Sequence, residues 1–356
     1  MRATEGDALG VAVVGAGGIA RSAHLPAIAR LRGQERLVSV FDTDAAAARA
    51  AGEAYGAYVA RTLEEALERP GVEAAVVCTP EAYHLEAVAA AAARGLSVLC
   101  EKPMAPSLEE ADAMIALAEA AGVVLMVGHS RRFTERYRKV YEAVAAGEVG
   151  EVRLVRENER RPRPRAGEAG TYWSRGHWTG DPRRSVGAIL TNGIHEADLF
   201  NWLIGARPVS VVAEERVTRA GGVVADFVSF CVRYDNGAVG ASEVNNAAPP
   251  GYGAFHEFEL YGTRGQVRAR DHEGAMVEVA GEGGVRHPEA YGLVLHVQEA
   301  YVREHLAFVD SVRHGTPPPV SARDGRLAVA VAVAAAEAAR TGRAAAVRAE
   351  GGGTGR

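Results

Sequence analysis

Lysine is rare in this sequence, and one lysine stands where its chemistry matters. Of the 40 lysine and arginine residues, only Lys102 and Lys139 are lysines. Lys102 belongs to CEKPMAPSLEEA, residues 100–111, which follows an apolar run. An ammonium is compact, has rotatable donors and can lose its proton when its surroundings lower its pKa, whereas a guanidinium stays charged. The residue type therefore marks this turn as a place that needs an amine rather than any cation.

Residues 13–20, VVGAGGIA, have the G-x-G-x-x-[GA] pattern of a dinucleotide-binding turn. Gly15 permits the tight turn, Gly17 lets a pyrophosphate approach the backbone, and the small Ala20 lets a helix pack closely on a strand. The pyrophosphate would then meet the N–H groups and the positive end of that helix. The pattern predicts a nucleotide site. A Rossmann-like domain that binds no nucleotide is the alternative.

An acidic residue, Asp42, ends the next apolar run, 22 residues after Ala20. A carboxylate at this place accepts hydrogen bonds from the ribose hydroxyls of NAD and repels the 2′-phosphate of NADP. We therefore expect NAD as the cofactor, with NADP less favoured.

Further polar groups follow the apolar run at residues 74–80. Thr79 and Pro80 stand at its carboxyl end, and doubly wound folds bind ligands at that edge of the sheet. His84 lies one turn into the helix expected next. By itself, His84 is better explained as a capping or packing residue.

The stretch GTYWSRGHWTGDPRRS, residues 170–185, is dense in aromatic and charged side chains. Aromatic faces stack on the apolar faces of sugar rings, and arginine and aspartate bind their hydroxyl groups. We expect Tyr172 and Trp178 to form the wall of a substrate site, with Arg183 behind them. A buried aromatic cluster beneath a loop is the alternative.

The elements that position these residues alternate regularly over the first 128 residues. Strand, helix and strand at short spacing indicate βαβ units, and continuous apolar runs are typical of parallel strands covered on both faces. This α/β pattern predicts a Rossmann domain over residues 1–128. Strands are expected at residues 11–15, 37–42, 74–80, 96–103 and 123–129, and helices at 18–31, 43–56, 81–94 and 107–121.

The pattern changes after about residue 150, where polar and apolar residues alternate. Asn-Gly in YDNGAV, residues 234–239, predicts a hairpin turn. We expect an α+β domain over residues 129–342 with a large, mostly antiparallel open sheet, and a flexible tail at 343–356. Strands are expected at residues 151–158, 208–217, 224–248, 255–271 and 275–286, and helices at 195–205, 293–314 and 323–341.

Composition is that of a globular protein, with 356 residues, 48% hydrophobic residues and a net charge of −5. No apolar run reaches transmembrane length, and the N-terminal residues lack the apolar segment of a signal peptide. The three cysteines show no metal spacing, and Cys78 and Cys100 are expected to be buried, inert thiols. We expect a cytoplasmic protein with no metal, no membrane partner and no nucleic-acid partner. The short basic run ERRPRPR, residues 159–165, is better explained as a solvated loop, or as a contact with an anionic substrate or a neighbouring subunit.

Four stretches together resemble one family closely: VVGAGGIARSAHLPAI, CTPEAYHLEAV, VLCEKPMAPSLEEADAMIALAEAAGV and VGHSRRF. They are similar to the Gfo/Idh/MocA oxidoreductases, named for glucose–fructose oxidoreductase, inositol dehydrogenase and a rhizopine catabolism protein. The resemblance runs from about residue 10 to residue 342, and Glu-Lys-Pro at a strand end is its most specific element. It implies oxidation or reduction of a carbinol in a sugar, polyol or related ring with NAD or NADP. It also implies a homodimer or homotetramer built through the C-terminal sheet.

The resemblance implies which residues contact the cofactor and the substrate. Lys102 matches the lysine that contacts both the nicotinamide ribose and the substrate hydroxyl, and Glu101 is expected to hold the nicotinamide end or to position Lys102. The sequence leaves open whether the bond before Pro103 is cis. The expected cofactor contacts are Gly15, Gly17, Gly18, Ile19, Asp42, Thr79, Pro80, His84, Glu101, Lys102 and Arg132.

The family's second catalytic cluster follows the pattern G-G-x-x-x-D-x-G-x-H, and this sequence departs from it. His195 takes the histidine position, but Val186 replaces the first glycine and Thr191 replaces the aspartate, with Asn192 beside it. An aspartate four residues before a histidine orients its ring and stabilises the imidazolium, whereas a threonine can only orient it. His195 is expected to take the hydroxyl proton, with Thr191 and Asn192 in support. A capping or packing role for His195 is the alternative.

These expectations converge on an NAD-dependent oxidoreductase that acts on a sugar, polyol or sugar-like ring. In the oxidative direction the nicotinamide takes a hydride from the carbinol carbon, His195 takes the proton, and Lys102 stabilises the developing charge on oxygen. Two other classes stay open. One is a glycoside hydrolase or lyase that uses tightly bound NAD as a transient redox cofactor, and the other is a non-catalytic NAD-binding sensor.

Overall fold

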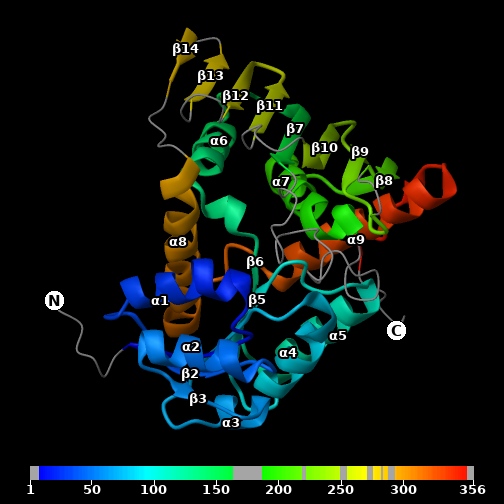
Figure 1. Ribbon diagram of the computed structural model, residues 1–356. Coiled ribbons are helices and arrows are strands. Elements are labelled where there is room, and N and C mark those ends of the chain that lie inside the picture. The colour runs from blue at the N-terminus through cyan, green and yellow to red at the C-terminus, as the bar shows by residue number, and fades with distance from the viewer. Residues whose placement is uncertain are drawn as a thin grey trace. The chain divides into compact units, whose positions relative to one another are not determined.

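The chain forms two compact units in the computed structural model, which describes residues 8–162, 187–218, 222–248, 255–270, 276–281, 284–287 and 293–350 (Figure 1). The first unit comprises residues 1–134 and 294–326, and the second comprises residues 135–293 and 327–356. Because residues 294–326 return to the first unit, the units differ from the continuous segments expected from the sequence.

A six-stranded parallel sheet forms the centre of the first unit, in the order β3-β2-β1-β4-β5-β6. The four strands β1, β4, β5 and β6 are buried at every residue, as expected for parallel strands covered on both faces. The expected Rossmann sheet is thereby confirmed. The strands are β1 (Leu9–Val14), β2 (Glu35–Phe41), β3 (Tyr58–Val59), β4 (Ala74–Val77), β5 (Ser97–Glu101) and β6 (Leu125–Gly128).

The chain runs outward from β1 to β3 and then outward in the other direction from β4 to β6. Because connections between parallel strands are right-handed as a rule, this reversal places helices on both faces of the sheet. The cap residues fix where the helices begin. Asp44 accepts hydrogen bonds from the N–H groups of Ala46 and Ala47, and Ser107 accepts one from Glu110. The helices are the π-helix η1 (Ala20–His24), α1 (Leu25–Arg30), α2 (Ala45–Tyr55), α3 (Leu63–Leu67), α4 (His84–Ala92) and α5 (Leu108–Ala121).

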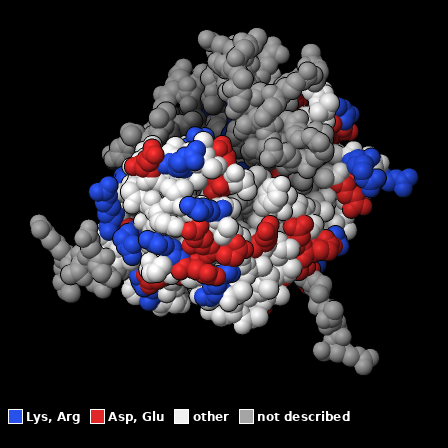
Figure 2. All heavy atoms as spheres, turned by 60° about the horizontal axis from the view of Figure 1, so that its bottom comes forward, with Lys and Arg blue, Asp and Glu red and all other residues white. Residues whose placement is uncertain are grey.

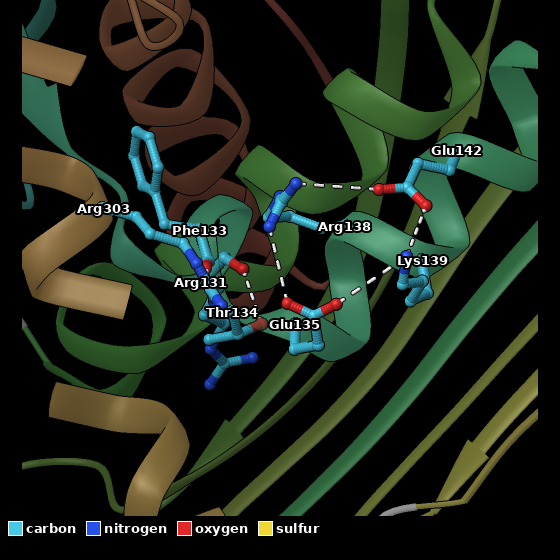
Figure 3. Close-up of polar contacts among 8 residues, drawn as sticks. All are labelled: Arg131, Phe133, Thr134, Glu135, Arg138, Lys139, Glu142 and Arg303. Carbon is cyan, nitrogen blue, oxygen red and sulfur yellow. Dashed lines mark hydrogen bonds and ion pairs between the residues drawn. The ribbon is translucent and has the colours of Figure 1, made fainter. Parts of the chain in front are cut away.

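Helix α8 (Leu293–His314) comes from near the end of the chain, yet from residue 294 on it belongs to the first unit. Its Tyr301 packs with Ala23 and Ala27 in the helical segment that follows β1. Arg303 donates a hydrogen bond of 3.2 Å to the carbonyl of Phe133 (Figure 3). The sequence predicts this helix, but not that it packs on the cofactor-binding unit.

A nine-stranded sheet forms the second unit, in the order β14-β13-β12-β11-β7-β10-β9-β8-β15. Among the described strands of this sheet, only β7 and β10 pair in parallel, so the expected, mostly antiparallel sheet is confirmed. The predicted hairpin turn is present at Asn236 and Gly237, between β9 and β10. The strands are β7 (Val152–Pro162), β8 (Pro208–Arg216), β9 (Phe227–Tyr234), β10 (Val239–Ala248), β11 (Phe255–Gly262), β12 (Gly265–Arg270), β13 (Met276–Gly281), β14 (Gly284–Arg286) and β15 (Ala345–Ala346).

Helices α6 (Glu135–Ala145) and α7 (Ile194–Ile204) pack on one face of this sheet. Successive residues of β10 alternate between half-buried and buried, which is typical of a sheet covered on one side. Phe200 of α7 lies so close to β10 that a Cβ on Gly240 would come within 2.4 Å of its ring. Helix α9 (Ala322–Thr341) precedes the last strand, β15.

Two expectations about individual segments are wrong. Ala345 and Ala346 pair with β8, because their backbone extends the edge of the sheet, so the flexible tail does not begin at residue 343. Residues 159–162 continue β7 instead of forming a solvated loop. Arg160 lies 3.8 Å from Glu243, and Arg161 bonds to a carboxylate of the same strand, so neighbouring acids balance these basic residues.

Charges of both signs lie side by side on the surface shown in Figure 2. Ion pairs in the described part of the chain join opposite charges, such as Arg94 with Glu68 and Arg323 with Glu119, each at 2.7 Å. Over the described residues that this view shows, the surface therefore carries no broad area of a single charge.

Candidate cofactor and active site

The glycine turn after β1 combines a steric requirement with open space. Gly15 has φ +94°, and a Cβ there would lie 2.8 Å from the backbone of Cys78. A Cβ on Gly17 or Gly18 would meet no described atom within 4 Å. Since no neighbouring protein atom requires glycine at residue 17, the reason for it lies in what approaches the turn. The residues present therefore fit a pyrophosphate and the N-terminal end of the following helix.

Asp42 lies at the carboxyl end of β2 and holds the glycine turn in place. Its Oδ2 accepts a hydrogen bond of 2.6 Å from the N–H of Ala16, and its Oδ1 accepts one of 2.8 Å from Asp44. A carboxylate has about four acceptor positions, so these two bonds leave room for ribose hydroxyls. The geometry fits the predicted role in binding NAD.

His84 connects the segments that follow β4 and β5. Its Nε2 lies 2.8 Å from the carbonyl of Thr79, and its Nδ1 lies 3.0 Å from the carbonyl of Pro103. Burial lowers the pKa of this imidazole, although the surrounding carbonyls act against it. The Thr79 hydroxyl is buried and makes no hydrogen bond within the described part of the chain, as suits a group that awaits a ligand. His84 thus braces two loops, and its direct contact with a cofactor stays a prediction.

Glu101 ends β5 and holds the backbone of Lys102. Its Oε2 accepts a hydrogen bond of 2.9 Å from the Lys102 N–H, and the peptide bond between Lys102 and Pro103 is cis. Burial raises the pKa of Glu101, but its hydrogen bond to His24 and the nearby charges of His24 and Lys102 outweigh that effect, so this pKa is lowered. An ionised Glu101 therefore stands beside the lysine that sequence reasoning singled out, at the carboxyl edge where Gly15 also lies.

The chain's other lysine has a different setting. Lys139 lies on α6, with Nζ 2.8 Å from Glu142 and 3.8 Å from Glu135 (Figure 3). Such pairs, three or four residues apart on a helix, are common on surfaces and contribute only a few tenths of a kcal/mol. Lys102 is therefore the lysine that the fold places at a ligand-binding edge.

A line of buried side chains extends from Glu101, and sequence reasoning missed it. His24 Nε2 lies 3.0 Å from Glu101 Oε1, and His24 Nδ1 lies 3.0 Å from His305 Nε2. His305 Nδ1 in turn lies 2.7 Å from Glu35 Oε2. All four residues are buried, with at most 4% of each accessible. His24 stands within the glycine-turn stretch, but no local pattern connects it with a histidine 281 residues away.

Two further side chains of α8 face this line. Tyr301 donates a hydrogen bond of 3.4 Å to Glu101 Oε1. Glu304 is fully buried, and neither of its carboxyl oxygens has a hydrogen-bond partner among the described residues. Burial raises the pKa of Glu304 well above its usual value, and the negative charge of Glu101 raises it further. Burial and the charge of Glu101 thus both favour the protonated form of Glu304.

The predicted proton acceptor lies in the second unit. Thr191 and Asn192 belong to the π-helix η5 (Ile189–Gly193), and His195 follows in α7. All three are buried, and Asn246 donates a hydrogen bond of 3.5 Å to Asn192. Thr191 precedes His195 by four residues, which places the two on successive turns of one helical segment. The helix thus brings these three predicted residues together. π-Helical turns are frequent at functional sites.

For four other predicted residues, the described structure shows no contribution to a cofactor or substrate site. Arg132, in η3 (Ser130–Phe133), is buried, and its guanidinium donates to the carbonyl of Pro319 at 3.2 Å and lies 3.6 Å from Asp324. These contacts give it a structural role, and contact with the cofactor stays a prediction. Tyr172, Trp178 and Arg183 lie outside the described residues.

The described side chains include no group of three or more His, Cys, Asp or Glu residues arranged to hold a metal ion. Among the helices that the structure describes, none has both the length and the apolar character needed to cross a membrane. Cys78 and Cys100 are buried, so the expected burial is confirmed. Burial raises the pKa of both thiols well above the usual value, which agrees with the prediction that they are inert.

Two family models match the chain. One, described as an oxidoreductase family with an NAD-binding Rossmann fold, matches residues 9–129. The other, described as the GFO/IDH/MocA C-terminal domain, matches residues 137–268. Together they cover the expected Rossmann strands and most of the second sheet.

Individual proteins are similar over nearly the whole chain. An inositol 2-dehydrogenase of Rhizobium meliloti is 30% identical over 326 residues, which is 91% of this chain and 94% of that protein. A myo-inositol 2-dehydrogenase of Thermotoga maritima is 30% identical over 76% of this chain and 78% of its own. Among solved structures, GenD2 from gentamicin A biosynthesis in complex with NAD has a TM-score of 0.80 and 29% identity, and 96% of each chain is covered.

Proposed function

Because the chain belongs to the Gfo/Idh/MocA family of NAD-binding oxidoreductases, we propose that it transfers a hydride between NAD and a carbinol of a sugar, polyol or sugar-like ring. The observation that carries the proposal is the position of Lys102. Its backbone is held by Glu101 at the carboxyl edge of the sheet, where the strand before the glycine turn also ends. The names of the inositol dehydrogenases support a polyol as the substrate.

Bound NAD supplies the hydride acceptor, and the residues of the chain manage charge and protons. Lys102 hydrogen-bonds the reacting oxygen and stabilises the negative charge that develops there. His195 takes the hydroxyl proton on a ring nitrogen, and Thr191 orients the ring. Asp42 favours NAD over NADP, because its carboxylate repels a 2′-phosphate.

The test is absorbance at the NADH band with NAD or NADP and a panel of sugars, inositols and uronic acids. On the best substrate, Lys102→Ala should lower kcat by about 100- to 10,000-fold, because charge stabilisation at the reacting oxygen is lost. The Kd for NAD should change by less than about tenfold, since most contacts lie elsewhere on the cofactor. Lys102→Arg should not restore activity, because a planar guanidinium is larger and stays charged.

Lys139→Ala is the matched control, and it should keep wild-type kcat because that lysine pairs with acidic residues of its own helix, on the helix surface. Wild-type kcat in Lys102→Ala would overturn the assignment. The same assay separates the two alternatives to a dehydrogenase, of which the neutral Thr191 leaves the sensor open. A product formed without net NADH indicates a lyase or hydrolase that reuses its NAD. Binding of NAD without turnover on any substrate indicates a sensor.

We also propose a homodimer or homotetramer that forms through the face of the nine-stranded sheet opposite α6 and α7. Val212 on β8 and its neighbour Cys231 on β9 are both exposed there. A cytoplasmic location fits the three cysteines, all of which are free thiols, because reducing compartments keep thiols reduced.

A further inference from the structure

The buried line of Glu101, His24, His305 and Glu35 contains three close contacts, and each needs one proton. The distances are 3.0, 3.0 and 2.7 Å, so a contact without a proton would place two lone pairs against each other. Two neutral imidazole rings supply only two protons. Two neutral rings and two ionised carboxylates carry only two protons between them. A hydrogen bond at all three contacts therefore requires a third proton on one of the four groups.

We propose that these four side chains form a proton relay, which moves one negative charge between Glu101 and Glu35 when the charge of the bound cofactor changes. The proposal rests on the function proposed above, because it assigns His24, His305 and Glu35 as positioning residues that act through Glu101. The line runs from the carboxyl end to the amino end of the parallel strands, since Glu101 ends β5 and Glu35 begins β2.

With both imidazole rings neutral, two arrangements of the same three protons satisfy every contact. In the first, His24 Nε2–H donates to an ionised Glu101, His305 Nε2–H donates to His24 Nδ1, and a protonated Glu35 donates to His305 Nδ1. In the second, each proton has moved to the other atom of its contact, so that Glu101 is protonated and Glu35 is ionised. No proton is gained or lost, and no bond between heavy atoms changes.

The structure favours the first arrangement at rest. The pKa of Glu101 is lowered, as described above, and burial lowers that of His24 despite the opposing effect of Glu101. An ionised Glu101 beside a neutral His24 matches the first arrangement. The other titratable or charged groups that face the line are Tyr301 and Glu304 of α8, Cys78 after β4, Cys100 of β5, His84 of α4, and Lys102.

The relay responds to the change in the charge of the cofactor. The oxidised nicotinamide ring is positive and the reduced ring is neutral, while ligands of this fold bind at the carboxyl edge where Glu101 lies. A buried carboxylate there is stabilised by the positive ring and destabilised once that charge is gone, because the interior screens charges weakly. The relay then moves the negative charge from Glu101 to Glu35, at the amino end of the strands, without exchanging a proton with water.

The test is nitrogen NMR of protein labelled at its histidine ring nitrogens, with NAD⁺ or with NADH bound. The signals of His24 and His305 are assigned by their loss in His24→Gln and His305→Gln. We expect both rings to carry the proton on Nε2 with NAD⁺ and on Nδ1 with NADH. Unchanged tautomers, or a change in only one ring, would overturn the relay.

Glu35→Gln tests the relay with little change in shape. Its amide donates permanently to His305 Nδ1, which locks the first arrangement. We expect both tautomers to stay fixed, and the affinity for NADH to fall about tenfold relative to that for NAD⁺, within the usual range of coupling between sites. A purely structural role would weaken both affinities equally. Glu299→Gln, the same change at a partly exposed glutamate of α8, should leave the ratio unchanged.

Failure of the relay is distinguishable from failure of the proposed function. Cofactor titration followed by fluorescence shows first whether the wild-type protein binds NAD⁺ and NADH. If it binds neither, the proposed function fails and the relay fails with it. If it binds both and oxidises a polyol while the rings keep their tautomers, only the relay is wrong.

Discussion

At the residue scale, the glycines of the first turn serve different purposes. Gly15→Ala should lower the free energy of unfolding by about 1–3 kcal/mol, because φ +94° is unfavourable for alanine and its Cβ would lie 2.8 Å from the backbone of Cys78. Gly17→Ala should leave Tm within about 2 °C, since its Cβ meets no described atom within 4 Å. It should instead weaken NAD binding about tenfold or more, because the Cβ occupies space that the pyrophosphate needs.

Thermal unfolding and NAD titration of the same variants check this separation. Gly33→Ala is the control, since its Cβ also meets no described atom within 4 Å and the residue lies away from the turn. It should change neither measurement. Equal loss of stability in Gly15→Ala and Gly17→Ala would show that the turn is built for packing alone.

At the scale of the element, α8 contains a buried acid that opposes folding at neutral pH. The folded pKa of Glu304 is raised, so the folded state holds its proton more tightly than the unfolded chain. Above the unfolded pKa of about 4.3, the unfolded chain ionises freely, and stability falls as pH rises towards the folded pKa. Below that value Glu304 is neutral in both states and this loss disappears.

Glu304→Met should therefore raise the free energy of unfolding near neutral pH by about 1 kcal/mol, because a buried acid without a partner is replaced by an apolar chain of similar length. That corresponds to a rise in Tm of about 2–4 °C, and the gain should shrink as the pH approaches 4. Thermal unfolding at several pH values measures it. Glu299→Met on the same helix serves as the control and should show no such pH dependence. A lower Tm at neutral pH would mean that Glu304 has a stabilising partner.

The contacts of α8 could not be predicted from the sequence, although other parts of the site could. The glycine turn, Asp42 and Lys102 were predictable, because each stands at the end of a continuous apolar run. Such a run indicates a parallel strand, and ligands bind at the carboxyl ends of parallel strands. Helix α8 was predictable as an element from its periodicity. Its contacts were not, since His305 meets His24 and Glu35 across 281 and 270 residues of chain. Buried polar pairs at that separation have no local signature, and only the packed structure shows them.

At the scale of the whole molecule, exposed apolar side chains gather around one strand of the second unit. Of the seven large hydrophobic side chains that are exposed in the described part of the chain, four are Val209, Val212, Val217 and Val223, all on β8 or the segment after it. Such a concentration, beside a sheet face that the described residues leave uncovered, is typical of an association surface. It supports contact between copies of the chain through this face.

Val212→Glu tests that contact, because Val212 is 52% exposed and lies opposite Cys231 in the ladder. A glutamate there would bury a charge between copies, so the dissociation constant should rise at least about tenfold, or by about 1.4 kcal/mol. Sedimentation velocity over a range of protein concentrations measures the change. Leu117→Glu makes a similar change at a side chain 38% exposed on α5 and should leave the mass of the oligomer unaltered. If Val212→Glu keeps the wild-type mass and affinity, the copies meet through another surface. If the wild-type chain is monomeric at micromolar concentration, the exposed valines serve no contact between copies.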